Sequence, residues 1–121
     1  MFVSSAGTTL GLLVCSAPWA ERSGREALDL ALAAAVLDRP LSLFFIGDGL
    51  WQLLHERDPT AAMLPPGQKA WASLPDLTTA AFYRRADQSV PASSCWWLEP
   101  TVLPPADWQL AQQRCTRLLV C

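Results

Sequence analysis

Two kinds of apolar pattern alternate along the first half of the chain. Residues 8–16 and 41–47 are short apolar runs without a helical period, which is typical of strands buried on both faces of a sheet. Between them, residues 25–38 are rich in alanine and leucine, with apolar side chains at three- and four-residue steps. This spacing predicts a helix that packs closely on the sheet. We expect Ser23 to be its N-cap, with Glu26 completing a capping box.

The second half of the chain carries weaker signals of the same two kinds. The predicted elements are a helical turn or two over 50–56, a short helix over 68–74, a strand over 77–85, a strand over 95–103 broken at Pro100, a helix beginning near Pro105, and a closing strand over 116–121. Strands that alternate with helices favour an α/β fold with a mainly parallel sheet. The length of 121 residues fits a single domain over 1–121.

The pair Asp48–Gly49 stands where the pattern changes from strand to helix. A strand, an Asp-Gly turn and a helix form a βα corner, and open α/β sheets build their sites at such corners. Asp48, near the start of the following helix, also suits the helix dipole. We expect the two phenylalanines before the corner to lie in the core, and Trp51 to lie at its rim.

The composition is apolar and poor in charge. Hydrophobic residues make up 51% of the chain and charged residues 17%, and six tryptophans are present. Tryptophan is enriched at protein interfaces, and large exposed apolar patches mark binding surfaces. We interpret the chain as a subunit that covers part of its surface with partner proteins. The alternative is a well-filled monomer core with some tryptophans at its edges.

The distribution of charge argues against two classes of partner. The net charge is −2, and Lys69 is the only lysine, whereas direct tight binding to nucleic acid needs clustered lysine and arginine. The apolar run over 10–15 is too short to span a membrane. A secretory signal would need a basic residue before its apolar run, but the first basic residue is Arg22. A strand therefore explains this run better than a targeting or membrane segment.

Cysteine chemistry is the one candidate chemistry in the chain. No phosphate-binding loop, dinucleotide motif or paired metal-ligand spacing is present, and His55 is the only histidine, so we expect neither a cofactor nor a metal site. A reactive thiol must be partly exposed and assisted towards thiolate. Cys15, at the end of the first predicted strand, and Cys95, after a polar loop, are the better candidates. Cys115, at a helix end, and Cys121, beside the terminal carboxylate, are disfavoured.

A combination of short motifs then suggests a family. The motifs are Ser16–Pro18 after the first strand, Gly24–Glu26 at the first helix, Phe44–Gly49 at the second strand, and Gln52–Leu54 after it. Their order and separation resemble the TusC/DsrF subunits of the DsrE/F-like sulfur-relay family. The resemblance is strong over residues 8–54 and loose over 55–100. It implies a three-layer α/β sandwich, with a mainly parallel central sheet flanked by helices.

The resemblance also implies partners and a task. Subunits of this family assemble in the cytoplasm with TusB-like and TusD-like subunits into a heterohexamer. The complex takes persulfide sulfur from a donor carrier protein and passes it to an acceptor carrier, towards the 2-thiouridine of tRNA. In sulfur-oxidising bacteria the related DsrEFH complex serves sulfur trafficking instead.

One departure from the family pattern bears on the role of this chain. Family members often carry a cysteine in the region of the third strand, but "TTAAFYRRAD" over 78–87 has none. This favours a non-catalytic structural subunit, with a partner interface that we predict at the corner residues Phe45, Asp48, Gly49, Trp51 and Leu54. The alternatives are a sulfurtransferase that carries persulfide on Cys95 or Cys15, and a DsrE-like homo-oligomer without a relay role.

Overall fold

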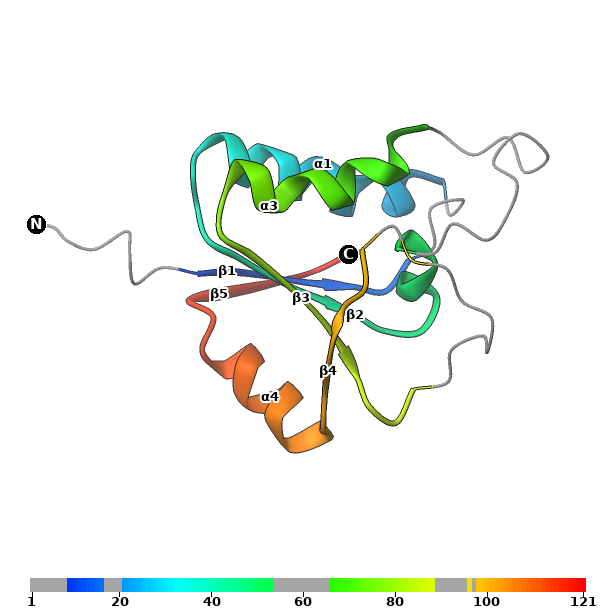
Figure 1. Cartoon of the computed structure of the whole chain (residues 1–121), viewed down its shortest axis with the longest axis vertical. Helices are drawn as coiled ribbons and strands as arrows, with labels where there is room; N and C mark the ends of the chain where they lie inside the picture. Colours follow the sequence, from blue (N-terminus) through cyan, green and yellow to red (C-terminus); the bar gives the residue numbers. More distant parts are fainter. Residues whose placement is uncertain (1–8, 17–20, 54–65, 89–95, 97) are drawn as a thin grey trace, which may run out of the picture.

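A five-stranded parallel sheet forms the centre of the molecule (Figure 1). The computed structural model describes residues 9–16, 21–53, 66–88, 96 and 98–121. The strand order is β4-β3-β2-β1-β5, and all four neighbouring pairs run parallel. The strands are β1 (Leu10–Val14), β2 (Leu41–Phe45), β3 (Ala80–Arg85), β4 (Thr101–Leu103) and β5 (Arg117–Val120). The last strand therefore returns to the opposite edge of the sheet from β4.

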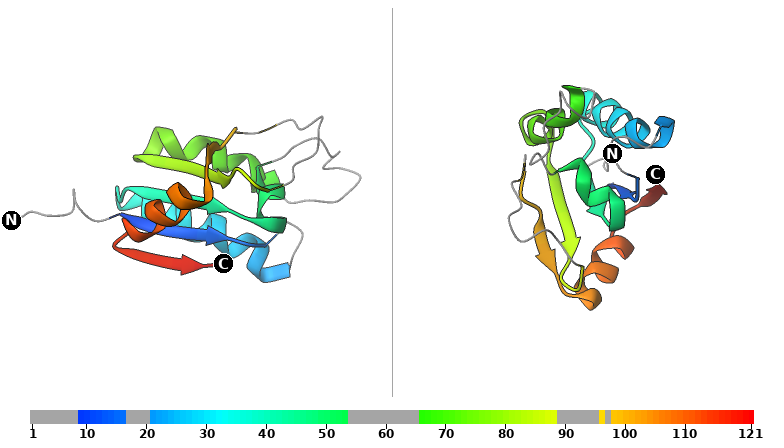
Figure 2. Two further views of the ribbon diagram at one scale, coloured as in Figure 1. Left: turned by 90° about the horizontal axis from the view of Figure 1, so that it is seen from below. Right: turned by 90° about the vertical axis from the view of Figure 1, so that its right-hand side faces the viewer.

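Helices cover both faces of this sheet, which gives three layers. α1 and α3 lie on one face and α4 lies on the other, as Figures 1 and 2 show. The helical elements are α1 (Glu21–Val36), the 3-10 helix η2 (Gly47–Gln52), the 3-10 helix η3 (Pro66–Ser73) that continues into α3 (Leu74–Leu77), and α4 (Pro105–Gln113). The α/β three-layer architecture expected from the sequence is confirmed. Within the described residues, no helix combines the length and the apolar character that crossing a membrane requires.

The main core lies between the sheet and α1. Four alanines of α1, at positions 27, 31, 34 and 35, are at most 7% exposed. Their small side chains let the helix approach the buried strand residues Leu12, Leu43 and Phe45, which have no exposed surface. The alanine-rich pattern in the sequence therefore marked the face of the helix that packs on the sheet.

An aromatic cluster fills the second face, under α4. The ring of Trp108 packs edge-on against Phe44 at a centroid distance of 5.3 Å, and Phe44 stacks on Tyr83 at 5.4 Å. Such offset and edge-on pairs are the favoured aromatic geometries. Close packing also explains Gly11 of β1, because a Cβ there would lie 2.7 Å from Cys115 Sγ and 2.8 Å from Leu118 Cδ1.

Two expectations about element ends are wrong. α1 begins at Glu21, so Ser23 lies inside the helix and is not its N-cap. Serine and glutamate three residues apart are also tolerated within a first helical turn, and the pattern alone does not fix the boundary. The segment after β2 is a 3-10 helix that begins at Gly47, so Asp48 and Gly49 lie within it and are not a turn before it.

The strands of the second half are shorter than predicted. β3 starts at Ala80, because residues 74–77 form α3. β4 covers Thr101–Leu103 only, with Pro100 before it and Pro104 after it. Proline cannot donate to a ladder, so it limits the strand at both ends.

Candidate functional site

The ends of three neighbouring strands meet at the carboxyl edge of the sheet. The backbone N–H of Cys15, just after β1, donates to the carbonyl oxygen of Cys121, just after β5, at 2.9 Å. On the other side, the N–H of Ile46 after β2 donates to Val14 O at 3.1 Å. Open parallel sheets bind ligands and partners at this edge, so we treat it as the candidate site.

Gln52 joins the elements around this edge. Its side chain is 2% exposed, and its Nε2 donates to the carbonyl oxygen of Ser16 at 2.9 Å. Its Oε1 accepts a hydrogen bond from Nε1 of Trp71, in η3, at 3.2 Å. A buried amide that bonds to two other segments fixes how its own segment and those two sit, because breaking a hydrogen bond inside the protein is costly. In the sequence, Gln52 stands out only as part of the Gln52–Leu54 motif. A polar residue between Trp51 and Leu53 was the signal of this role.

The five predicted interface residues differ in how far they are exposed to solvent. Phe45 has no exposed surface and packs edge-on against Trp71 at 5.3 Å, and Gly49 is buried. Asp48 is exposed and Trp51 is partly exposed, whereas Leu54 lies outside the described residues. Phe45 in the core and Trp51 at its rim were both predicted correctly. Of the predicted residues that the structure describes, Asp48 and Trp51 are therefore the two whose side chains are open to a partner.

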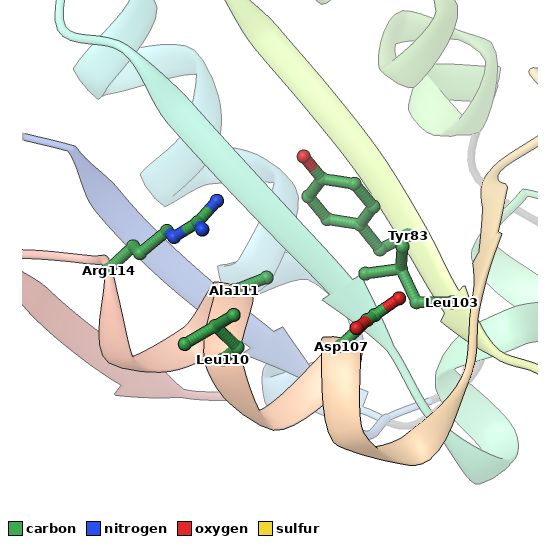
Figure 3. Close-up of a pocket in the computed structure, with 6 residues that line it drawn as sticks. All are labelled: Tyr83, Leu103, Asp107, Leu110, Ala111 and Arg114. Carbon is green, nitrogen blue, oxygen red and sulfur yellow. The ribbon is translucent and has the colours of Figure 1, made fainter.

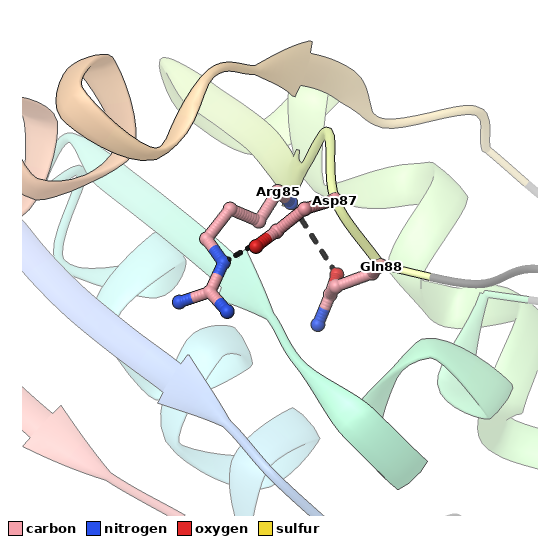
Figure 4. A network of polar contacts seen from close by, with 3 residues as sticks. All are labelled: Arg85, Asp87 and Gln88. Atoms are coloured by element: carbon pink, nitrogen blue, oxygen red, sulfur yellow. Dashed lines mark hydrogen bonds and ion pairs between the residues drawn. The ribbon is translucent and has the colours of Figure 1, made fainter.

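A short turn after β3 reaches the same edge of the sheet. Figure 4 shows Arg85, whose Nε lies 2.7 Å from Asp87 Oδ1 and whose backbone N–H donates to Gln88 Oε1 at 3.3 Å. The side chains of Arg85 and Asp87 are 35% and 52% exposed, so water screens the ion pair and it contributes little to stability. The contacts shape the turn and leave no group there with unusual chemistry.

The structure separates the cysteines into two places. Cys15 and Cys121 lie together at the carboxyl edge, whereas Cys115 lies under α4 on the other face of the sheet, and Cys95 is outside the described residues. Burial raises the pKa of the Cys15 thiol. The pKa of Cys121 is also raised by burial, and further by the Glu26 carboxylate and by Cys15.

The pKa of the Cys115 thiol is raised as well. Burial raises its pKa, and a hydrogen bond with Ser42 offsets part of that effect. Thiolate, not thiol, is the nucleophile in sulfur transfer. The three thiols in the described part of the chain are therefore protonated and weakly nucleophilic at neutral pH.

This electrostatic result predicts how Cys15 reacts with an alkylating reagent. In a variant that keeps Cys15 and carries serine at the other three cysteines, the alkylation rate should rise with pH. It should reach half of its limit above the ordinary pKa of 9.0, because the raised pKa delays thiolate formation. Iodoacetamide labelling followed by mass spectrometry measures the profile, and the same variant in denaturant is the control. A folded-state midpoint below that of the denatured control would contradict the account.

A hollow between α4 and the sheet lies beside the aromatic cluster (Figure 3). It has a volume of about 330 Å³ and is lined by Tyr83, Leu103, Asp107, Leu110, Ala111 and Arg114. A smaller adjoining hollow of about 210 Å³ reaches Cys115 and Ser42. Because the pKa of Cys115 is raised, this second hollow does not supply an activated nucleophile. Among the described residues, no group of three or more His, Cys, Asp or Glu side chains is placed to hold a metal ion.

The strand order, the helices on both faces and the joined strand ends define a layered α/β protein with its candidate site at the carboxyl edge of the sheet. The model of the DsrE/DsrF-like family matches residues 9–83, and the chain belongs to this family. The family expected from the sequence motifs is thereby confirmed. The crystal structure of the ychN protein from E. coli has the same fold, with a TM-score of 0.64 at 13% identity over 94% of this chain and 99% of that one.

Curated relatives are similar over a shorter segment. A TusC homolog from Aliivibrio fischeri is 46% identical over 50 residues, which is 41% of this chain and 42% of the relative. TusC from Klebsiella pneumoniae subsp. pneumoniae is 46% identical over 48 residues, covering 40% of each chain. TusC from Klebsiella pneumoniae strain 342 is 39% identical over 54 residues, covering 45% of each. The matched segments span less than half the length of these relatives.

Proposed function

We propose that this chain is a TusC-type subunit of a sulfur-relay complex, and that it supports sulfur transfer without carrying sulfur itself. The observation that carries the proposal is the family match over residues 9–83, together with relatives named TusC. The proposed partners are a TusB-like and a TusD-like subunit in a cytoplasmic heterohexamer. The proposed task is to hold these subunits while persulfide sulfur moves from a donor carrier to an acceptor carrier, towards 2-thiouridine in tRNA.

The thiol chemistry supports the non-carrying role. To accept a sulfane sulfur, a cysteine attacks the donor persulfide as thiolate, and a raised pKa slows this step because it lowers the thiolate fraction. The pKa values of Cys15, Cys115 and Cys121 are all raised. β3 and the turn after it, residues 80–88, contain no cysteine. The alternative carrier Cys95 lies outside the described residues, and the experiment below includes it.

The surface supports the partner-binding role. Among the described residues, eight large apolar side chains are exposed, including Val36 at 82%, Leu37 at 70% and Val120 at 68%. Together with the low share of charged residues, these side chains favour a chain whose surface is covered in an assembly. This agrees with the interpretation, from the composition, of a subunit whose surface is partly covered by partner proteins.

The test is sulfur loading of the purified complex. The chain is co-expressed with the TusB-like and TusD-like subunits, and the complex is incubated with a cysteine desulfurase and cysteine. Intact mass spectrometry should show a reducible one-sulfur adduct on a partner subunit and none on this chain. The TusD-like subunit with its own cysteines replaced by serine is the control for the adduct on the partner.

Two results would overturn the proposal. A one-sulfur adduct on this chain that disappears in Cys95→Ser or Cys15→Ser would make it a sulfurtransferase. Failure of the wild-type chain to associate with either relay subunit would remove it from the complex altogether, and a homo-oligomer seen by native mass spectrometry would replace the proposal.

A further inference from the structure

A groove runs between α1 and β5 at one edge of the sheet. Its volume is about 560 Å³. Leu30 and Ala33 of α1 and Leu37 just after α1 line one side, with Leu119 of β5 among the residues opposite. Leu30 is 39% exposed and Leu37 is 70% exposed. A row of leucines open to water along a helix and a strand is costly unless something covers it. The groove is separate from the corner at η2, where the sequence predicted the interface.

The strand that forms one wall of this groove is also the edge of the sheet. Figure 2 shows β5 as the outermost strand, and β1 is its one neighbour in the sheet. The backbone N–H of Cys121 donates to Leu13 O at 2.9 Å, and its carbonyl oxygen accepts from Cys15 N–H at 2.9 Å. Backbone groups alternate in direction along a strand. Leu118 and Val120, which are one and three residues before Cys121, therefore direct their N–H and C=O groups away from β1.

The two edges of the sheet are protected to different degrees. β4 at the far edge stands between Pro100 and Pro104, and prolines discourage pairing with another strand. β5 has the sequence Arg-Leu-Leu-Val, with a single charge, and its exposed residues include Leu118 at 37% and Val120 at 68%. Edge strands of monomers normally carry charges or prolines that block such pairing. The β5 edge lacks this protection.

The charges around the groove indicate what fits it. Among the described residues, Arg39 and Arg117 line the groove, and no carboxylate does. In the part of the chain that the structure describes, the one ion pair joins Arg85 and Asp87, so neither groove arginine is paired there. A second copy of β5 would bring another Arg117, and Glu26, the carboxylate that acts on Cys121, lies at the opposite end of that strand. Complementary charge therefore favours a different polypeptide with acidic side chains.

We propose that β5 and the α1–β5 groove bind an extended segment of a different polypeptide, which adds to the sheet as a strand and places apolar and acidic side chains against Leu30, Leu37, Arg39 and Arg117. Main-chain hydrogen bonds to Leu118 and Val120 supply the pairing, and the groove supplies the selectivity. This inference rests on the proposed function, because the polypeptide is a subunit of the relay complex.

The test uses the complex of the chain with the TusB-like and TusD-like subunits. Hydrogen exchange should show the amides of Leu118 and Val120 protected in the complex and unprotected in the chain alone. Val120→Lys, which puts a charge on the exposed edge, should weaken assembly about tenfold or more. Thr101→Lys is the matched control, because Thr101 is an exposed residue of β4 at the opposite edge of the sheet and does not line the groove, and it should assemble like the wild type.

A charge reversal tests the acidic character of the partner. Arg117→Glu should weaken assembly about tenfold, whereas Arg114→Glu, an exposed arginine outside the groove, should not. If the wild-type complex forms but β5 stays unprotected and Val120→Lys assembles normally, this inference is wrong and the proposed function stands. If no complex forms, both this inference and the proposed function are wrong. Protection of β5 by self-association of the chain alone would also overturn the choice of a different polypeptide.

Discussion

Replacing Gly49 by alanine is expected to destabilise the fold by about 3 kcal/mol or more. A Cβ at this position would overlap the carbonyl oxygen of Val14 and lie 2.6 Å from its carbonyl carbon. These are backbone atoms of a buried central strand and cannot rotate away as a side chain would, so η2 must move away from β1. Chemical denaturation of Gly49→Ala and the wild type, followed by circular dichroism, measures the difference.

The matched control for this substitution is Gly47→Asn. Gly47 has a φ of 57°, and no atom lies within 4 Å of a Cβ built on it. Asparagine tolerates this left-handed conformation better than most residues, so the loss should stay within about 1 kcal/mol. A Gly49→Ala variant as stable as Gly47→Asn would show that η2 does not pack against β1 as described.

Replacing Trp71 by alanine is the second large expected effect, with a loss of about 3–5 kcal/mol in the free energy of unfolding. Trp71 has no exposed surface, and its ring packs edge-on against Phe45. The substitution would leave a large cavity between η3 and the sheet. It would also remove the donor to Gln52 Oε1, which would then be a buried acceptor without that bond.

Trp71→Phe separates the two contributions. It keeps much of the aromatic packing and removes the indole N–H, so its loss should be about 1–2 kcal/mol, from one lost hydrogen bond to a buried amide and a smaller ring. Thermal and chemical unfolding of both variants measure the two steps. Losses under about 1 kcal/mol for both would contradict the role of the Gln52–Trp71 contact in fixing the carboxyl edge.

The sequence predicted the elements whose apolar pattern is unambiguous. The runs that became β1 and β2 are apolar on both faces, and α1 shows its buried face as a series of alanines, so their type did not depend on the rest of the chain. The element after β2 was harder to predict. Gly49 of this 3-10 helix lies against the Val14 carbonyl, a contact between residues distant in the sequence that no local pattern predicts.

The candidate site was predictable only in part. The carboxyl end of β2 was identified from the change of pattern at Asp48, but the hydrogen bond between Gln52 and Trp71 joins two segments whose packing no local pattern encodes. Cys15 and Cys121 lie together only because the chain crosses by way of α4 to the far edge and places β5 beside β1. No local pattern in the sequence predicts this strand order.

The exposed edge was missed for a related reason. Leu118, Leu119 and Val120 form an apolar run that predicts a buried strand, and a single sequence does not distinguish a central strand from an edge strand that a partner covers. The apolar composition indicated that an interface exists, and the corner at Asp48 and Trp51 was the location predicted for it. The groove beside β5 is a second proposed location. Its strand carries two exposed large apolar side chains, Leu118 and Val120.

The central claim is that the chain serves the relay as a structural subunit and that the thiol chemistry belongs to other subunits. The most direct test is the 2-thiouridine content of tRNA in cells that lack the chain, complemented either by the wild type or by a variant with serine at Cys15, Cys95, Cys115 and Cys121, with thermal unfolding to confirm that the variant folds. The account predicts that loss of the chain lowers 2-thiouridine and that both forms restore it. A folded variant that restores no more 2-thiouridine than an empty vector would contradict the account.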